Sequence, residues 1–215
     1  MRFAVLGSGS QGNGTLIASG NTLVLVDCGF SLRETERRLA LLGVSAQQLS
    51  AVLVTHEHAD HVHGVGLLAR RYNVPVYLSR GTLRGMRKPV EAAGFLAANE
   101  HLQIGGLSIR AVGVTHDALE PLQYVFDNGS RRFGVLTDLG SYDAALLESY
   151  QGLDALLIEA NHCRDLLGRG PYPMFLKQRV GGDYGHLNNH QAARLVSELD
   201  WQNPVSYTHL TLPTN

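Results

Sequence analysis

The sequence predicts an α/β protein, of the α+β kind, in which two mixed β-sheets are flanked by helices in an αββα sandwich. Three observations predict it. Short apolar runs typical of strands recur along the chain, segments with helical spacing of apolar residues lie between some of them, and the turn sequence Asp127-Asn128-Gly129-Ser130 joins two others as a hairpin. Strands connected by both helices and hairpins favour mixed sheets with helices on their outer faces.

In the first half of the chain, strands are expected at residues 2–6, 15–18, 22–26, 51–54 and 74–78. Helices are expected at 32–42, where Gly43 is a plausible stop, and at 62–72. Residues 80–94 also have a helical pattern, but Pro89 interrupts it.

In the second half, strands are expected at residues 107–114, 123–126, 132–136 and 155–158, and helices at 142–150 and 189–199. These elements predict one domain over residues 1–204. Residues 205–215, VSYTHLTLPTN, follow a helix without completing a further element. We expect them to be a non-native tail, and the domain to be incomplete at its C-terminal end.

Composition limits the possible classes of protein. The 215 residues carry a net charge of −1, so no overall basic field indicates nucleic-acid binding. Lys and Arg do cluster between residues 70 and 88, although such a cluster is usually a solvated face. The two cysteines form no disulfide framework. No apolar stretch has the length of a membrane span and no signal peptide begins the chain, so a cytoplasmic protein is expected.

The most informative segment is Thr55-His56-Glu57-His58-Ala59-Asp60-His61, which follows an apolar run. Alternate residues of an extended strand end point the same way, so His56 and His58 can bind one metal ion. Asp60 and His61 lie past the strand and can face a second ion. Imidazole and carboxylate groups bind zinc, manganese or iron. A His-rich polar loop is the alternative explanation, and further candidate ligands downstream argue against it.

Those further candidates each follow or interrupt an apolar segment: Asp27, His116, Asp138 and His186. One such residue alone is more often satisfied by a backbone partner. Their recurrence changes the interpretation, because strand ends of a layered sheet converge on one edge, where ligands bind.

In this order, the motifs resemble the five-motif pattern of the metallo-β-lactamase fold and, more narrowly, its YycJ/WalJ-like branch. The residues that carry the resemblance are Leu6–Asn13, Val26–Gly29, Leu53–His58, Val65–Tyr72, Thr115–Ala118, Glu159–His162 and Gly185–Asn189. The resemblance implies two divalent metal ions. His56, His58 and His116 would hold one ion, Asp60, His61 and His186 the other, and Asp138 would bridge them. Asp27 would be an outer partner of a metal-binding histidine, or simply cap its turn.

The resemblance also implies the reaction. A hydroxide between the ions would attack a phosphodiester, with Asp60 orienting it and His186 beside it, and His162 would act as a general acid or contact a phosphate. A DNA-directed 5′-to-3′ exonuclease is the first hypothesis. The alternatives are a small-molecule ester or thioester hydrolase, such as a glyoxalase II-like enzyme or a cyclic-nucleotide phosphodiesterase, and a non-catalytic metal-binding relative.

Polar residues beside these motifs are the expected substrate contacts: Ser8, Ser10, Asn13, Asn161 and Asn188. The first three belong to a Gly/Ser loop whose backbone can approach an anion, although it lacks the Gly-Lys-Ser/Thr ending of a P-loop. Three positions depart from the branch pattern. Gln11 and Asn188 stand where Ser is common, and Cys163 stands where a carboxylate is common.

Overall fold

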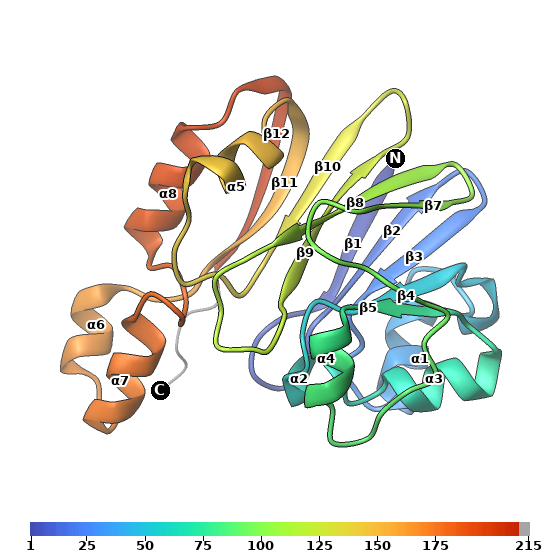
Figure 1. Cartoon of the computed structure of the whole chain (residues 1–215), viewed down its shortest axis with the longest axis horizontal. Helices are drawn as coiled ribbons and strands as arrows, with labels where there is room; N and C mark the ends of the chain where they lie inside the picture. The colour runs from blue at the N-terminus through green and yellow to red at the C-terminus, as the bar shows by residue number, and fades with distance from the viewer. Residues whose placement is uncertain (211–215) are drawn as a thin grey trace. The chain divides into compact units, whose positions relative to one another are not determined.

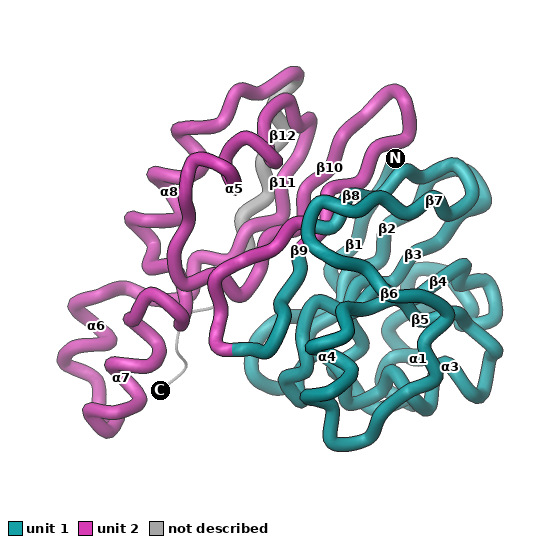
Figure 2. The backbone as a smooth tube through the Cα atoms, viewed as in Figure 1, with its two compact units in different colours: residues 1–111, 118–122 teal, residues 112–117, 123–215 magenta. Residues whose placement is uncertain are grey.

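The computed structural model describes residues 1–210, with side chains up to Gln202. The chain divides into two compact units (Figure 2). Unit 1 consists of Met1–Ala111 and Ala118–Leu122, and unit 2 consists of Val112–Asp117 and the chain from Gln123 onward. The chain crosses between them three times, after residues 111, 117 and 122. Among residues 1–210, no helix combines the length and the apolar character that crossing a membrane requires.

Unit 1 contains a six-stranded mixed sheet in sequential order (Figure 1). Its strands are β1 (Arg2–Gly7), β2 (Gly14–Ser19), β3 (Thr22–Val26), β4 (Ala51–Leu53), β5 (Val76–Leu78) and β6 (Gly94–Phe95). The first three pair antiparallel, as tight turns allow, and β3 to β6 pair parallel. Strand β7 (His101–Ile104) forms a hairpin with β8 (Leu107–Gly113), which leads into unit 2.

The connections in unit 1 are α1 (Leu32–Leu41), the 3₁₀ turn η1 (Ala46–Gln48), α2 (Ala59–Val62), α3 (Val65–Tyr72) and α4 (Arg80–Gly85). Ser31 and Ser79 cap α1 and α4 by accepting backbone N–H bonds. Leu39 of α1 and Leu68 of α3 are fully buried in one core cluster with β4 and β5. This core fixes the end of β4, from which the histidine-rich segment begins.

Unit 2 contains β9 (Leu122–Asp127), β10 (Arg132–Leu136), β11 (Leu153–Ala160) and β12 (Trp201–Leu210). β9 and β10 are an antiparallel hairpin, whereas β10, β11 and β12 pair parallel, so the second sheet is also mixed. The helices are α5 (Ala144–Ser149), α6 (Arg164–Arg169), α7 (Met174–Gly181) and α8 (Asn189–Ser197). Leu146 of α5 and Leu195 of α8 are buried with β11 in a second core, and α6 lies beside α7 (Figure 1).

The elements expected from the sequence are largely confirmed, including the hairpin turn, where Gly129 has a φ of 81°. One expectation was wrong, and a second was only partly confirmed. The helix expected over 62–72 is interrupted between α2 and α3 around Gly64, whose added Cβ would lie 2.3 Å from the Phe30 carbonyl oxygen. The segment 80–94 is helical only over α4, which ends at Gly85 before Pro89 is reached, and the chain then extends into β6.

The sequence pattern did not reveal β7, α6, α7 and β12. The backbone of β12 continues past residue 204 and pairs with β11, including Ala155 with Val205. Residues 211–215 of the expected tail lie outside the described residues. The expectation of one domain ending at residue 204 with a non-native tail stays a prediction.

Candidate metal centre

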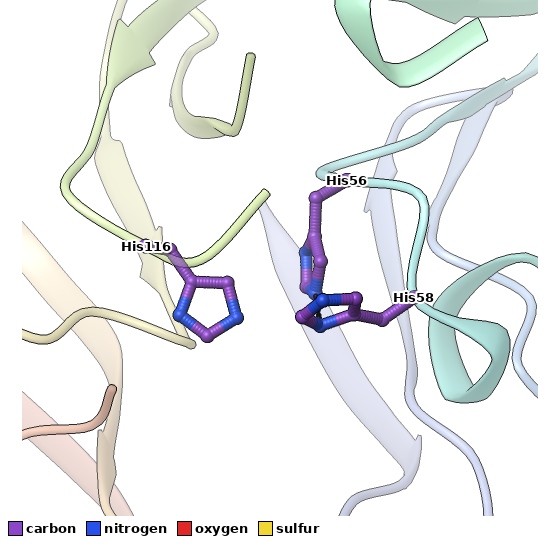
Figure 3. A group of neighbouring side chains, drawn as sticks. All are labelled: His56, His58 and His116. Atoms are coloured by element: carbon purple, nitrogen blue, oxygen red, sulfur yellow. Dashed lines mark hydrogen bonds between the residues drawn. The ribbon is translucent and has the colours of Figure 1, made fainter. Parts of the chain in front are cut away.

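The ligand segment of unit 1 begins where β4 ends. His58 is the N-cap of α2 and has an extended backbone, and the chain turns into a helix just after it. Their rings lie edge to face, with His56 Nε2 3.0 Å from His58 Nδ1 (Figure 3). Two imidazole nitrogens at this distance can share one proton or bind one cation, which suits a metal site.

His61 of α2 is held by a buried carboxylate. Its Nδ1 lies 2.8 Å from Oδ2 of Asp27, and both side chains are almost fully buried. Asp27 also accepts hydrogen bonds of 2.8 Å from the backbone N–H and the hydroxyl of Thr55. A proton on Nδ1 is thereby directed to Asp27, and Nε2 keeps the lone pair that a metal ligand needs.

Asp27 directly follows β3 and has a φ of 60°, in the left-handed region that non-glycine residues seldom adopt. Strained backbone of this kind is typical of functional sites. Asp27 N donates to the Leu53 carbonyl at 2.8 Å, so the strain is compensated by fixed contacts to the end of β4.

Asn13, in the Gly/Ser loop between β1 and β2, contacts two of the expected ligands. Its Nδ2 donates to Asp60 Oδ2 at 3.0 Å and lies 2.9 Å from His61 Nε2, while its Oδ1 accepts from Gly9 N at 2.9 Å. The side chain therefore positions Asp60 and His61 within unit 1. Ser8 and Ser10, the other loop residues expected to contact substrate, line a neighbouring pocket of about 650 Å³.

In unit 2, His116 follows β8 and is almost fully buried. Its Nδ1 lies 3.0 Å from the Gly185 carbonyl oxygen, to which it can donate, leaving Nε2 for a metal. Asp117 Oδ1 lies 3.2 Å from Nε2. Burial lowers the pKa of His116, and Asp138 opposes the shift, so the ring is largely neutral near pH 7, as a ligand requires.

Asp138, Glu159 and His186 form a second group in unit 2, and their ligand atoms all lie within 4.8 Å of one another. His186 Nδ1 is 3.0 Å from Glu159 Oε2 and 3.5 Å from Asp138 Oδ1. Asp138 N donates to Glu159 Oε2 at 3.2 Å. Asp138, just past β10, has a φ of 41°. Like Asp27, it therefore has a backbone in the left-handed region at the end of a strand.

The charge in this group changes the protonation of His186. Burial would lower its pKa, but the hydrogen bond and charge of Glu159, with Asp138 and Asp117, raise it to about 9. Without a cation, the imidazolium compensates the carboxylates. A divalent cation would take over that role and displace the proton.

Glu159 is the residue that sequence reasoning missed. It ends β11 in the Glu159–His162 motif, which was quoted without a role for this carboxylate. The recurrence of acidic residues at strand ends was the available signal.

The remaining expected site residues also lie in unit 2. Asn161 Nδ2 donates to Glu159 Oε1 at 3.0 Å. His162 is buried, and Nδ1 has no hydrogen-bond partner among the described residues. Asn188 is the N-cap of α8, where its Oδ1 accepts from His190 N and Gln191 N, so its amide oxygen is already occupied. The expected site residues thus form one set in each unit.

Each set fits divalent cations by its donor chemistry. Unit 1 supplies imidazole nitrogens and Asp60, and unit 2 supplies imidazoles and carboxylates, the donors that zinc and manganese prefer. In both units an outer carboxylate contacts the second nitrogen of a histidine, which is typical of metal-binding imidazoles.

Comparison with known proteins identifies the family. The family described as the Beta-lactamase superfamily domain matches residues 22–210, and the chain belongs to it. A Bacillus anthracis protein named exodeoxyribonuclease YycJ is 33% identical over 222 residues, covering 100% of this chain and 84% of that protein. A Streptococcus pneumoniae serotype 2 protein named exodeoxyribonuclease WalJ is 35% identical over 202 residues, covering 91% of this chain and 75% of that protein.

Solved structures share the fold. The metallo-β-lactamase fold protein YhfI from Bacillus subtilis matches with a TM-score of 0.72 and 21% identity, covering 99% of this chain and 87% of that chain. Zn²⁺-bound PqqB from Methylobacterium extorquens matches with a TM-score of 0.73 and 17% identity, covering 98% and 89%. The family and the fold of two mixed sheets with flanking helices, expected from the motifs, are confirmed.

Proposed function

We propose that this protein is a metal-dependent phosphodiesterase that degrades DNA as an exonuclease. The observation that carries the proposal is its similarity, over nearly its whole length, to two relatives named exodeoxyribonuclease. The imidazole and carboxylate sets in both units support a metal-dependent hydrolase. The 5′-to-3′ direction expected from the sequence is part of the proposal.

The proposed ligands are those expected from the motifs. His56, His58 and His116 would hold one divalent ion, Asp60, His61 and His186 would hold a second, and Asp138 would be shared. Zinc or manganese suits these donors, and iron is a further possibility. When bound, such ions lower the pKa of water and offset negative charge on phosphoryl oxygens.

The chain's own residues would orient these groups. Asp27 and Glu159 fix the rings of His61 and His186 by their contacts to Nδ1. Asn13 holds the carboxylate of Asp60, which can orient a water molecule and accept its proton. Burial, followed by the charges of neighbouring groups, lowers the pKa of His162, so it is mostly neutral near pH 7. Both roles expected from the sequence, contact with a phosphate and general acid, remain part of the proposal for His162.

A stretch of unit 1 that is rich in exposed Arg and Lys supports DNA as the substrate. Arg70 and Arg71 lie in the last turn of α3 and are exposed, and exposed basic residues continue through and after α4: Arg80, Arg84, Arg87 and Lys88. Arginine and lysine bind the phosphate backbone without reading sequence. This local cluster can bind DNA even though the whole chain has a net charge of −1.

The test is cleavage of a 5′-labelled double-stranded DNA by the purified chain with added manganese or zinc, with a chelator as control. Hydrolysis of a small phosphodiester is measured alongside. We expect metal-dependent release of nucleotides from DNA, and the double variant Arg84→Gln/Arg87→Gln should lose DNA cleavage while keeping hydrolysis of the small ester. Metal-dependent hydrolysis of the small ester without DNA cleavage would overturn the proposal in favour of a small-molecule substrate. Cytoplasmic location stays a prediction.

A further inference from the structure

Unit 2 contains a second feature of chemical interest, a pocket of about 640 Å³ bounded by α6, α7 and the start of α8. We call it the basic pocket. Three cationic side chains and two imidazoles line it: Arg164, Lys177, Arg194, His162 and His190. Among the residues whose side chains the structure describes, none that lines it carries a carboxylate. A concave site with several cations and no anion favours a negatively charged ligand.

A buried polar group in the wall also lacks a partner. His162 is only 2% exposed, and its Nδ1 has no hydrogen-bond partner within the described part of the chain. A buried nitrogen without a partner is costly, so such a group points to a ligand or water that completes it. Gly181 lies beside this wall, where a Cβ would make only ordinary contacts, 3.9 Å from His162 Nε2 and 3.6 Å from Leu167 Cδ2.

The cations differ in how far they are already neutralised. Arg194 is paired with Glu198 at 2.8 Å, and Lys177 Nζ donates to the Gly168 carbonyl at 2.7 Å. Arg164 is exposed and is in no ion pair among residues 1–202. Its guanidinium is thus the cation most available to a ligand, and its planar group suits two oxygens of a phosphate.

The start of α8 contributes little through its backbone. Asn189 N donates to the His162 carbonyl, and His190 N and Gln191 N donate to the Asn188 side chain. These N–H groups are occupied, so an anion would be bound by the side chains, with only the field of the helix in addition.

We propose that the basic pocket binds a phosphate group of a nucleotide, separate from the phosphate that is cleaved. The inference deepens the proposed function and rests on it for the identity of the substrate. The volume is large for phosphate alone and leaves room for the attached nucleoside. His162 directly follows Asn161, whose Nδ2 donates to Glu159 Oε1 at 3.0 Å, and Glu159 also contacts His186, so this wall of the pocket adjoins the ligand group of unit 2. It would hold the strand beside the scissile bond.

The test is binding of dTMP to the full chain by calorimetry in the presence of a chelator, so that bound metal does not contribute. Inorganic phosphate and thymidine are measured in parallel. We expect dTMP and phosphate to bind and thymidine not to bind. Arg164→Gln should weaken dTMP binding about tenfold, because it removes a charge-assisted hydrogen bond. Arg169→Gln is the matched control, since Arg169 is exposed on the same helix but does not line the pocket.

A second variant tests the buried wall. His162→Phe retains an aromatic ring but removes the unpartnered nitrogen, and it should also weaken dTMP binding. Equal binding by wild type, Arg164→Gln and His162→Phe would overturn the pocket assignment, as would tighter binding of thymidine than of phosphate. Binding is measured without metal, so it does not depend on DNA cleavage. If the protein binds dTMP but cleaves no DNA, only the proposal of an exonuclease is refuted. If the protein cleaves DNA but does not bind dTMP, only the proposal that the basic pocket binds a nucleotide phosphate is refuted.

Discussion

The two units supply their candidate ligands in different ways. In unit 1 they come from one short segment, His56–His61, at the end of β4 and in α2. In unit 2 they come from separate positions, after β8, after β10 and before α8. The first set is built by local chain geometry, whereas the second depends on the tertiary fold to bring distant residues together.

The carboxylates that contact the histidines also differ between the units, in how far they are buried. The His61 and Asp27 side chains are 1% and 4% exposed, whereas those of His186 and Glu159 are 23% and 17% exposed. Unit 1 therefore holds its histidine in a buried, fixed pair, and unit 2 holds its histidine in a pair that solvent and cations can reach. We therefore expect changes to the His61–Asp27 pair of unit 1 to affect the stability of the protein. We expect the His186–Glu159 pair of unit 2 to respond to pH and to added cations.

The largest effect is expected from Asp138→Asn. Asparagine tolerates the left-handed backbone at this position, so the change removes a charge without adding strain. Loss of a shared ligand should reduce bound metal and DNA cleavage together, by more than the roughly 10–100-fold typical of outer partners. Metal content by mass spectrometry and cleavage rate check this. Asp200→Ala, an exposed aspartate, is the control, and full activity with a normal metal count would refute the role of Asp138.

Glu159→Gln should lower activity about 10–100-fold, as expected for a carboxylate that orients a metal-binding imidazole. Above about pH 9, where the His186 charge is already lost, its effect on the free energy of unfolding should be small, because Glu159 is partly exposed. Cleavage rate and urea unfolding are measured side by side, with the exposed Glu148→Gln as control. A large loss of stability without loss of activity would show that Glu159 stabilises unit 2 and does not serve the reaction, which contradicts the account.

Asp27→Asn should lower activity to a similar extent and also destabilise the protein, by about 1–3 kcal/mol. An amide has one acceptor oxygen, so it cannot satisfy both Thr55 groups and His61 as the carboxylate does. Urea unfolding of the metal-free protein measures the loss. Unchanged stability would show that the buried pair in unit 1 is not structural.

The metal-free protein should become less stable between about pH 6.5 and pH 9. The folded-state pKa of His186 is raised to about 9, above its ordinary value, because Glu159 and other carboxylates outweigh the effect of burial. Its stabilising charge is fully present below about pH 6.5 and is lost as the pH rises through about 9. The decrease should be of the order of 1–3 kcal/mol and absent in His186→Gln. A flat profile in the wild type would contradict it.

The smallest expected effect is a difference between the two cysteines in their rate of alkylation. Burial raises the pKa of the Cys28 thiol to about 11, opposed by its contact with Thr35. Cys28 should therefore resist alkylation of the native protein near pH 8, while the partly exposed Cys163 reacts. Peptide mass spectrometry after a short iodoacetamide treatment checks the order. Faster labelling of Cys28 would show that the core of unit 1 opens.

These contrasts explain what the sequence could predict. The strands and the histidine segment were predictable because side-chain alternation and ligand spacing are local properties. The role of Glu159 was not, because its value depends on contacts with Asp138 and His186, 21 and 27 residues away in the chain. The short helices α6 and α7 and the basic pocket were missed as well. No residue of α7 is buried, so no apolar stripe marks it.

The most direct test of the account is a double-mutant cycle between the units, with DNA cleavage as the readout. His58→Ala removes a ligand of unit 1, Asp138→Asn removes one of unit 2, and the third protein carries both changes. If both sets serve one reaction, the double variant should be little worse than the more impaired single variant. If the two losses instead multiply, each variant acts independently, which would contradict the proposal that both sets of ligands serve one metal-dependent reaction.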